Sequence, residues 1–166
     1  MDEAVYFKMI SDKTASLFSA SAEIGAITVD ASNEERKALK VFGEKLGIAF
    51  QIKDDLFDII GNQDGLGKPV GFDVKKNMLT LPFIHLLSTI DASEKKHILS
   101  RLKYYANKQD LNSIKKMIID SGSMKYAENL MLEISKDAIE KLNIFEDSDA
   151  KKSLILLVEY NLERSK

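Results

Sequence analysis

"IAFQIKDDLFDII", residues 48–60, places three carboxylates in one of the most apolar runs of the chain. On a helix, its apolar residues leave almost no polar face beyond Asp54, Asp55 and Asp58. Clustered carboxylates repel one another, and burying an unpaired charge is costly. No Lys or Arg lies three or four positions from any of these acids. The stretch therefore predicts a helix whose acids meet positive charge from elsewhere in the fold or from an ion.

The composition is typical of one helical domain. With 166 residues the chain is long enough for a real core and too short to expect two domains. Hydrophobic residues make up 45% and charged residues 30%, and there are only two prolines, which favours helix. The net charge of −2 gives no reason to expect a nucleic-acid partner. Because cysteine is absent, disulfides, thiolate zinc sites and cysteine nucleophiles are excluded.

Helical periodicity dominates the chain, and no convincing alternating strand occurs. Ser32 or Asn33 is expected to cap the second helix, and the Gly-rich segment 61–71 to end it. The predicted helices cover residues 3–25, 34–60, 73–90, 94–106, 110–120, 124–142 and 148–163. The expected fold is therefore a single all-helical domain over residues 1–166.

Neither end of the sequence carries a membrane-directed pattern. "MDEAVYFKMISDK" (1–13) has acidic and basic side chains where a secretory signal requires an apolar stretch. The apolar run "SLILLVEY" (153–160) is too short to span a bilayer. These features predict a cytoplasmic protein without a transmembrane segment.

The acids form a polar stripe with Gln51. Gln51, Asp55 and Asp58 stand at i, i+4 and i+7, and Asp54 precedes Asp58 by four residues. One interpretation is a solvated face of surface acids. The apolar residues on the remaining faces argue against it, and carboxylates one turn apart suit Mg²⁺, which bridges to substrate phosphate. The stripe therefore favours a metal–diphosphate site.

The loop after this helix contains three glycines and Lys68 within residues 65–71. Glycines let a backbone approach a ligand closely, and Lys68 is a point charge suited to phosphate. The spacing excludes a P-loop, because Asn62 stands five residues before Gly67 and Pro69 replaces the required Ser or Thr. It also excludes an EF-hand, since Ile60 would be the first ligand.

Three segments together carry a family resemblance: "KTASLF" (13–18), "GIAFQIKDDLFD" (47–58) and "GLGKPVGFDVKKNMLTLP" (65–82). In this order and spacing they resemble the trans-isoprenyl diphosphate synthases, especially the bacterial long-chain members of the octaprenyl type. The resemblance implies an all-α helical bundle of the isoprenoid synthase type. It also implies a Mg²⁺-dependent prenyltransferase that condenses an allylic diphosphate with isopentenyl diphosphate.

The resemblance also assigns roles to residues of this chain. Asp54 would bind the metal, with Asp55 and Asp58 supporting it through waters or hydrogen bonds. Lys13 and Lys68 would hold the allylic diphosphate and stabilise the charge that grows on the leaving group. Thr14 and Gln51 would place oxygen dipoles near the carbocation. Lys76 would add positive charge further from the diphosphate.

The chain departs from the family pattern in one respect, because it holds one aspartate-rich motif where the family has two. The resemblance therefore extends over the C-terminal half of such a synthase, and the positions that set product length lie outside it. The family also implies a homodimer, with the helix at 3–25 near the contact. The alternative is a non-catalytic helical subunit or interaction module derived from such a synthase.

Overall fold

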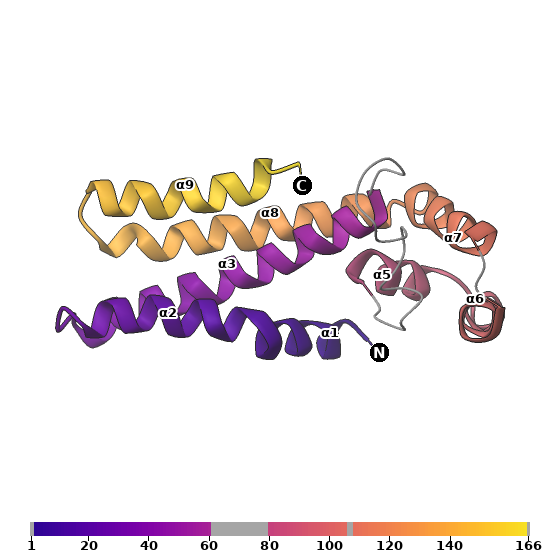
Figure 1. Cartoon of the computed structure of the whole chain (residues 1–166), viewed down its shortest axis with the longest axis horizontal. Helices are drawn as coiled ribbons and strands as arrows, with labels where there is room; N and C mark the ends of the chain where they lie inside the picture. Colours follow the sequence, from indigo (N-terminus) through magenta and orange to yellow (C-terminus); the bar gives the residue numbers. More distant parts are fainter. Residues whose placement is uncertain (1, 61–79, 106–107, 166) are drawn as a thin grey trace. The chain divides into compact units, whose positions relative to one another are not determined.

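The computed structural model describes residues 2–60, 80–105 and 108–165. These residues form helices and no strand, as Figure 1 shows, which confirms the predicted all-α class. Their contacts divide into two compact units, each built from segments far apart in the sequence. The first unit comprises Met1–Tyr6 and Asp54–Glu128, and the second comprises Phe7–Lys53 and Asn129–Lys166. The expectation of a single domain stays a prediction.

The first predicted helix, 3–25, is a helical run in three parts. α1 (Glu3–Ile10) passes into a π-helical segment, η1 (Ser11–Ala15), and then into α2 (Ser16–Ile27). A π-helix widens the turn locally, and such bulges are frequent at functional sites. Hydrophobic periodicity does not reveal a bulge of this length, which is why the sequence predicted an unbroken helix.

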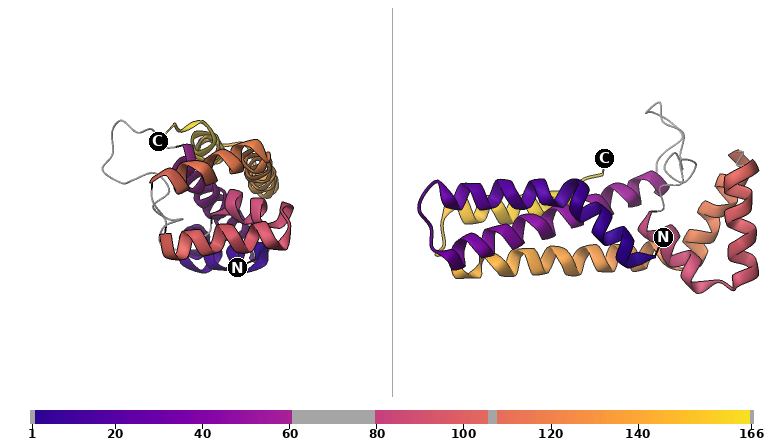
Figure 2. Two further views of the ribbon diagram at one scale, coloured as in Figure 1. Left: turned by 90° about the vertical axis from the view of Figure 1, so that its right-hand side faces the viewer. Right: turned by 90° about the horizontal axis from the view of Figure 1, so that it is seen from below.

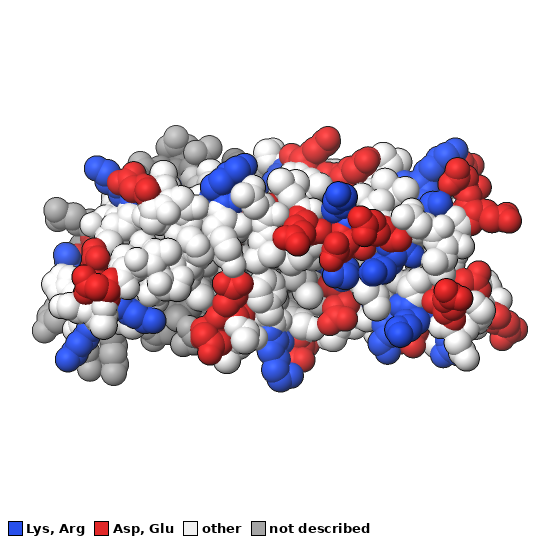
Figure 3. All heavy atoms as spheres, turned by 180° about the vertical axis from the view of Figure 1, so that it is seen from behind, with Lys and Arg blue, Asp and Glu red and all other residues white. Residues whose placement is uncertain are grey.

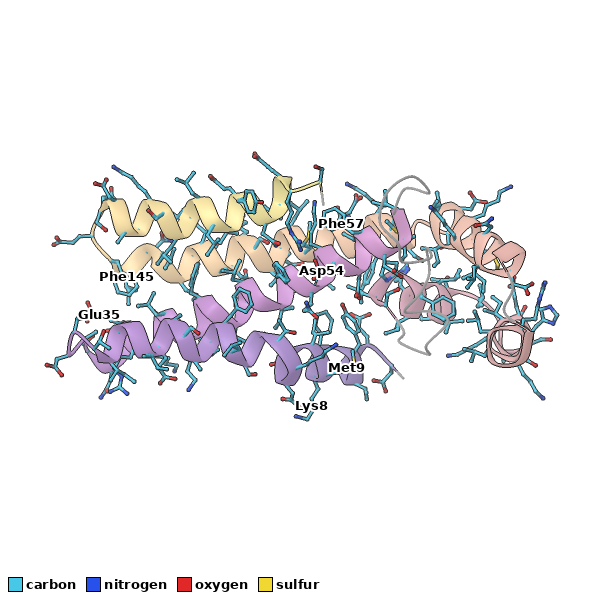
Figure 4. All side chains as sticks on the ribbon, in the orientation of Figure 1. Lys8, Met9, Glu35, Asp54, Phe57 and Phe145 are labelled. Atoms are coloured by element: carbon cyan, nitrogen blue, oxygen red, sulfur yellow. The ribbon has the colours of Figure 1, made fainter. Side chains whose placement is uncertain are left out.

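α3 (Asn33–Ile60) is the long helix that carries the opening stretch. It begins with a reciprocal cap at Ser32, as predicted. Glu35, labelled in Figure 4, accepts a 2.8 Å hydrogen bond from the Ser32 backbone N–H, and the Glu35 N–H donates to Ser32 Oγ at 3.2 Å. This capping box satisfies backbone N–H groups that the first turn leaves without helical partners.

The second unit has an apolar core between α3, α8 (Ser123–Lys141), η2 (Leu142–Ile144) and α9 (Asp149–Glu163). Figures 1 and 2 show α9 running beside the part of α8 that belongs to this unit. Phe145, labelled in Figure 4, is half-buried against this core. The fully buried members are Phe42, Leu46, Ala138, Leu142 and Val158.

Two glycines let α3 approach the preceding helix closely within the second unit. A Cβ on Gly43 would lie 2.4 Å from the backbone oxygen of Phe18 in α2. A Cβ on Gly47 would lie 2.6 Å from Cα of Ala15 in η1. Because Gly43 and Gly47 are four residues apart, they share one face of α3. That face lies against the backbone of η1 and α2.

The first unit has its own core, formed by the end of α3 with α5 (Leu81–Thr89), α6 (Ala92–Tyr105) and α7 (Lys108–Asp120). Residues 73–79 of the predicted helix 73–90 lie outside the described residues, and α5 begins at Leu81. An ion pair between Arg101 and the buried Asp110 links α6 to α7. The buried core residues are Ile59, Phe83, Leu86, Leu87, Ile98, Leu102, Ile114 and Ile118.

The charges of the surface are mixed. Figure 3 shows acidic and basic side chains interspersed on the face seen from behind. In the part of the chain that the structure describes, every helix is too short or too polar to cross a membrane.

Candidate functional site

The three acids of the opening stretch lie on the last turns of α3, where Figure 4 labels Asp54. All three side chains are half-buried, and Oδ2 of Asp58 is fully buried. Asp54 and Asp58 are four residues apart and share one face of the helix. Asp55 points about 100° round the helix axis from Asp54, because each residue of an α-helix turns by that angle.

Asp55 connects three helices of the first unit. Its Oδ2 accepts a 2.7 Å hydrogen bond from the hydroxyl of Tyr6 in α1. The same oxygen accepts a 3.1 Å hydrogen bond from the backbone N–H of Leu81, the first residue of α5. The resemblance assigned Asp55 to support the metal through waters or hydrogen bonds, and that role stays a prediction. The sequence did not reveal the contacts with Tyr6 and Leu81.

Tyr6 is 1% exposed, and its environment favours the neutral phenol. Burial raises the pKa of Tyr6 far above its ordinary value, and the negative charge and hydrogen bond of Asp55 raise it further. The charges of Asp54 and Glu3 add smaller contributions to this pKa. Tyr6 is therefore a fixed hydrogen-bond donor toward Asp55 at neutral pH.

Lys13 and Thr14 both lie in the π-helical segment η1. Lys13 is exposed and Thr14 is half-buried. At the start of η1, Ser11 Oγ donates a 3.0 Å hydrogen bond to Glu44 of α3. At its end, Ala15 meets Gly47 in the close approach described above. These two contacts hold the predicted Lys–Thr pair alongside α3 within the second unit.

Gln51 is half-buried on α3, one turn beyond Gly47. It therefore lies on the side of α3 that faces η1, the segment that carries Thr14. The second unit thus brings the elements of Lys13, Thr14 and Gln51 together.

The C-terminal residues make contacts with α3 that sequence reasoning missed. Arg164 donates a 3.1 Å hydrogen bond to the backbone oxygen of Phe50, and its guanidinium carbon lies 4.2 Å from the centre of the Phe50 ring. Lys53 Nζ donates a 2.7 Å hydrogen bond to the backbone oxygen of Leu162. These contacts place cationic groups on the α3 turn that carries Gln51. No local pattern could have revealed them, since each joins residues over a hundred positions apart.

Two predicted phosphate-binding residues, Lys68 and Lys76, lie outside the described residues, as does the Gly-rich loop. The acids belong to the first unit, whereas Lys13, Thr14 and Gln51 belong to the second. The meeting of these groups in one site therefore stays a prediction.

The donor set of α3 fits a magnesium ion that keeps most of its water. Among the residues that the structure describes, no group of three or more His, Asp or Glu side chains is arranged so that it could hold a metal ion. Mg²⁺ usually binds through one or two carboxylates and completes its octahedron with waters and substrate phosphates. Asp54 and Asp58, one turn apart, provide that number of carboxylates on one helix face.

A model of a protein family described as polyprenyl synthetase matches residues 1–120 of the chain. Among curated proteins, geranylgeranyl diphosphate synthase of Sulfolobus acidocaldarius is 40% identical over 99% of this chain and 50% of that protein. Octaprenyl diphosphate synthase of Haemophilus influenzae is 30% identical over 98% of this chain and 50% of that protein. The chain thus spans about half the length of these relatives.

Solved structures show the same similarity. A decaprenyl diphosphate synthase from Rhodobacter capsulatus superposes with a TM-score of 0.90 and 31% identity, over 100% of this chain and 51% of that one. A polyprenyl synthase from Caulobacter crescentus, complexed with calcium and isoprenyl diphosphate, gives a TM-score of 0.89 at 28% identity, with the same coverage. The match includes every helix described above.

Proposed function

Since this chain belongs to the polyprenyl synthetase family, we propose that it forms the half of a trans-prenyl diphosphate synthase that binds the allylic diphosphate through Mg²⁺. The observation that carries the proposal is the pair Asp54 and Asp58 on one face of α3, within a chain that matches the family model from residue 1 to 120. The Caulobacter relative, which binds calcium and isoprenyl diphosphate, supports a divalent cation and a diphosphate as the ligands.

The reaction proposed for the whole protein is a condensation of an allylic diphosphate with isopentenyl diphosphate. The allylic C–O bond breaks and the diphosphate leaves with the electron pair. The double bond of isopentenyl diphosphate then forms a new C–C bond with the resulting carbocation, and a proton is lost. When bound, Mg²⁺ neutralises negative charge on the departing diphosphate.

The residues of this chain bind and orient the substrate in this scheme. Asp54 holds the metal, and Asp58 supports it from the same helix face. Lys13 and Lys68 bind phosphate oxygens, where their positive charge stabilises the leaving group as its charge grows. Thr14 and Gln51 direct oxygen dipoles at the carbocation. Lys76 contributes positive charge further from the diphosphate.

The product length, the Mg²⁺ requirement and the cellular setting belong to the same proposal. A long-chain, octaprenyl-like product stays a prediction, because the relatives include both geranylgeranyl and octaprenyl diphosphate synthases. The homodimer and the cytoplasmic location also stay predictions.

Thermal unfolding of the 166-residue chain with Mg²⁺, with pyrophosphate and with both tests the proposed site. A ligand that binds only the native state stabilises it by mass action, by about 2.7 kcal/mol at a hundredfold excess over Kd. We expect the two ligands together to raise Tm by more than the sum of their separate effects. The corresponding stabilisation should be smaller than about 2.7 kcal/mol, because the chain spans about half the length of its relatives. Asp54→Ala should abolish the synergy.

Glu23→Ala is the control, because it also removes a half-buried carboxylate, one that forms an ion pair with Lys40 and has no role in the proposed site. It should lower Tm while keeping the synergy. If Asp54→Ala responds to the two ligands as the wild type does, Asp54 is not the ligand and the stripe is a solvated face.

A further inference from the structure

Asp55 and Asp54 are adjacent in sequence but occupy different surroundings. Within the described part of the chain, Asp55 Oδ2 accepts hydrogen bonds from two buried residues, since Tyr6 is 1% exposed and Leu81 is 0% exposed. Oδ2 of Asp55 is therefore directed at the interior of the first unit. Asp54 lies about 100° away round the helix, on the face that it shares with Asp58.

The start of α5 depends on Asp55 for its capping. A helix leaves its first backbone N–H groups without intrahelical partners, and a carboxylate at this end is stabilising. Thr80, the residue before α5, makes no side-chain cap, and its buried Oγ has no hydrogen-bond partner among the described residues. Asp55, which lies 26 positions earlier in the sequence, instead accepts a hydrogen bond from the backbone N–H of Leu81, the first residue of α5. Without it, this buried N–H would lose its acceptor, which is costly.

We infer that Asp55 is a positioning residue: its carboxylate fixes Tyr6 of α1 and the first turn of α5 to the helix that carries Asp54. The inference rests on the proposed function only in the role given to Asp54. The anchoring of α5 stands on the two hydrogen bonds themselves.

Asparagine substitutions separate the two roles. An Asn side chain keeps a carbonyl oxygen that accepts hydrogen bonds from Tyr6 and Leu81, but it lacks the charge that Mg²⁺ prefers. Calorimetric titration of pyrophosphate into the chain with Mg²⁺ should give a Kd for Asp55→Asn close to that of the wild type. Asp54→Asn should weaken binding by about tenfold or more, because even loss of a metal ligand's outer-shell partner costs about 10- to 100-fold.

Hydrogen exchange of backbone amides tests the anchor without any ligand. Asp55→Ala and the milder Tyr6→Phe should speed exchange at Leu81 and Phe83 in the first turn of α5. Exchange at Ile118 of α7, buried in the same core, should change less. Tyr6→Phe removes only a hydroxyl, which guards against an Asp55→Ala variant that does not fold.

Each outcome decides the inference. Unchanged exchange at Leu81 in both variants would overturn the anchor, and a loss of binding in Asp55→Asn equal to that in Asp54→Asn would make Asp55 a metal ligand. If the wild type binds no pyrophosphate in the presence of Mg²⁺, the proposed function fails. The exchange measurements still decide the role of Asp55 in that case.

Discussion

At the scale of single residues, the ion pair between Lys45 of α3 and Asp137 of α8 makes stability depend on pH. Lys45 Nζ lies 2.9 Å from Asp137 Oδ2. The hydrogen bond and the charge of Lys45 lower the pKa of Asp137 below its ordinary value. A carboxyl with a lowered folded-state pKa adds stability above its unfolded-state pKa, and this stability is lost as pH falls through the folded-state value.

We therefore expect Lys45→Gln to be less stable than the wild type at neutral pH, with a difference that shrinks as the medium becomes acidic. Urea unfolding at a series of pH values measures this. Lys37→Gln is the control, because Lys37 is exposed on the same helix and makes no ion pair within the described residues. A Lys45→Gln deficit of constant size at every pH would show that Asp137 does not titrate in this way.

At the scale of elements, the close approach of α3 to η1 and α2 requires glycine. A Cβ on Gly43 would meet backbone atoms of Phe18 and Ser19 at 2.4–2.9 Å, and backbone cannot move aside as a side chain can. We expect Gly43→Ala to destabilise the chain by about 1–3 kcal/mol, the usual cost of overpacking. Chemical denaturation measures the difference.

Gly25→Ala is the matched control, since Gly25 lies in α2 and a Cβ added there would have no neighbouring atom within 4 Å. Alanine is the better helix former by about 0.5–1 kcal/mol, so this variant should gain stability. A loss in Gly25→Ala comparable to that in Gly43→Ala would contradict the packing explanation.

The start of α3 depends on its capping box. Ser32→Ala removes the oxygen that accepts the Glu35 N–H and should cost about 1 kcal/mol, the typical value for losing an N-cap. Ser113→Ala, at an exposed position inside α7, should stay within about 0.5 kcal/mol of the wild type. Equal effects of the two substitutions in urea unfolding would rule out a stabilising cap.

At the scale of the whole molecule, exposed apolar residues predict self-association. α2 and the turn after it carry the exposed side chains of Leu17, Ile24, Ile27 and Val29, with Leu17 70% exposed. Large exposed apolar patches drive association. We expect a dimer or higher oligomer in sedimentation at micromolar concentration, and Leu17→Lys with Ile24→Lys should shift it toward monomer.

Leu156→Lys on α9 is the control for this change, because Leu156 is also exposed but lies on another helix. It should leave the sedimentation profile of the chain unchanged. A wild-type chain that sediments as a monomer would contradict the prediction.

Activity also belongs to the whole molecule. The 166-residue chain holds one aspartate-rich motif and spans about half the length of its relatives. The resemblance assigns this motif as the second of the family's two, so the first motif and the diphosphate contacts it would make through metal are missing from the chain. Only interactions made in the transition state accelerate a reaction. We expect no measurable chain elongation from this chain alone, assayed as incorporation of isopentenyl diphosphate. Robust incorporation would refute this.

The sequence by itself determined the helices and the family. α3 begins and ends within one residue of the predicted 34–60, and α8 and α9 match 124–142 and 148–163 equally closely. These elements were predictable because apolar periodicity, Ser caps and glycine breaks act between residues a few positions apart. The family followed from motifs whose order and spacing are visible along the chain, and the match over residues 1–120 confirms it.

Only the tertiary structure identified the partners of the acidic stretch. The motif resemblance gave Asp54 and Asp55 different roles but named no partner for Asp55. Its partners Tyr6 and Leu81 lie 49 and 26 positions away and meet it only when α1 and α5 pack against α3. The Arg164 contact with Phe50 has the same origin, across 114 positions. Hydrogen bonds act over about 3 Å in space and carry no trace in sequence spacing, so folding alone assigns these partners.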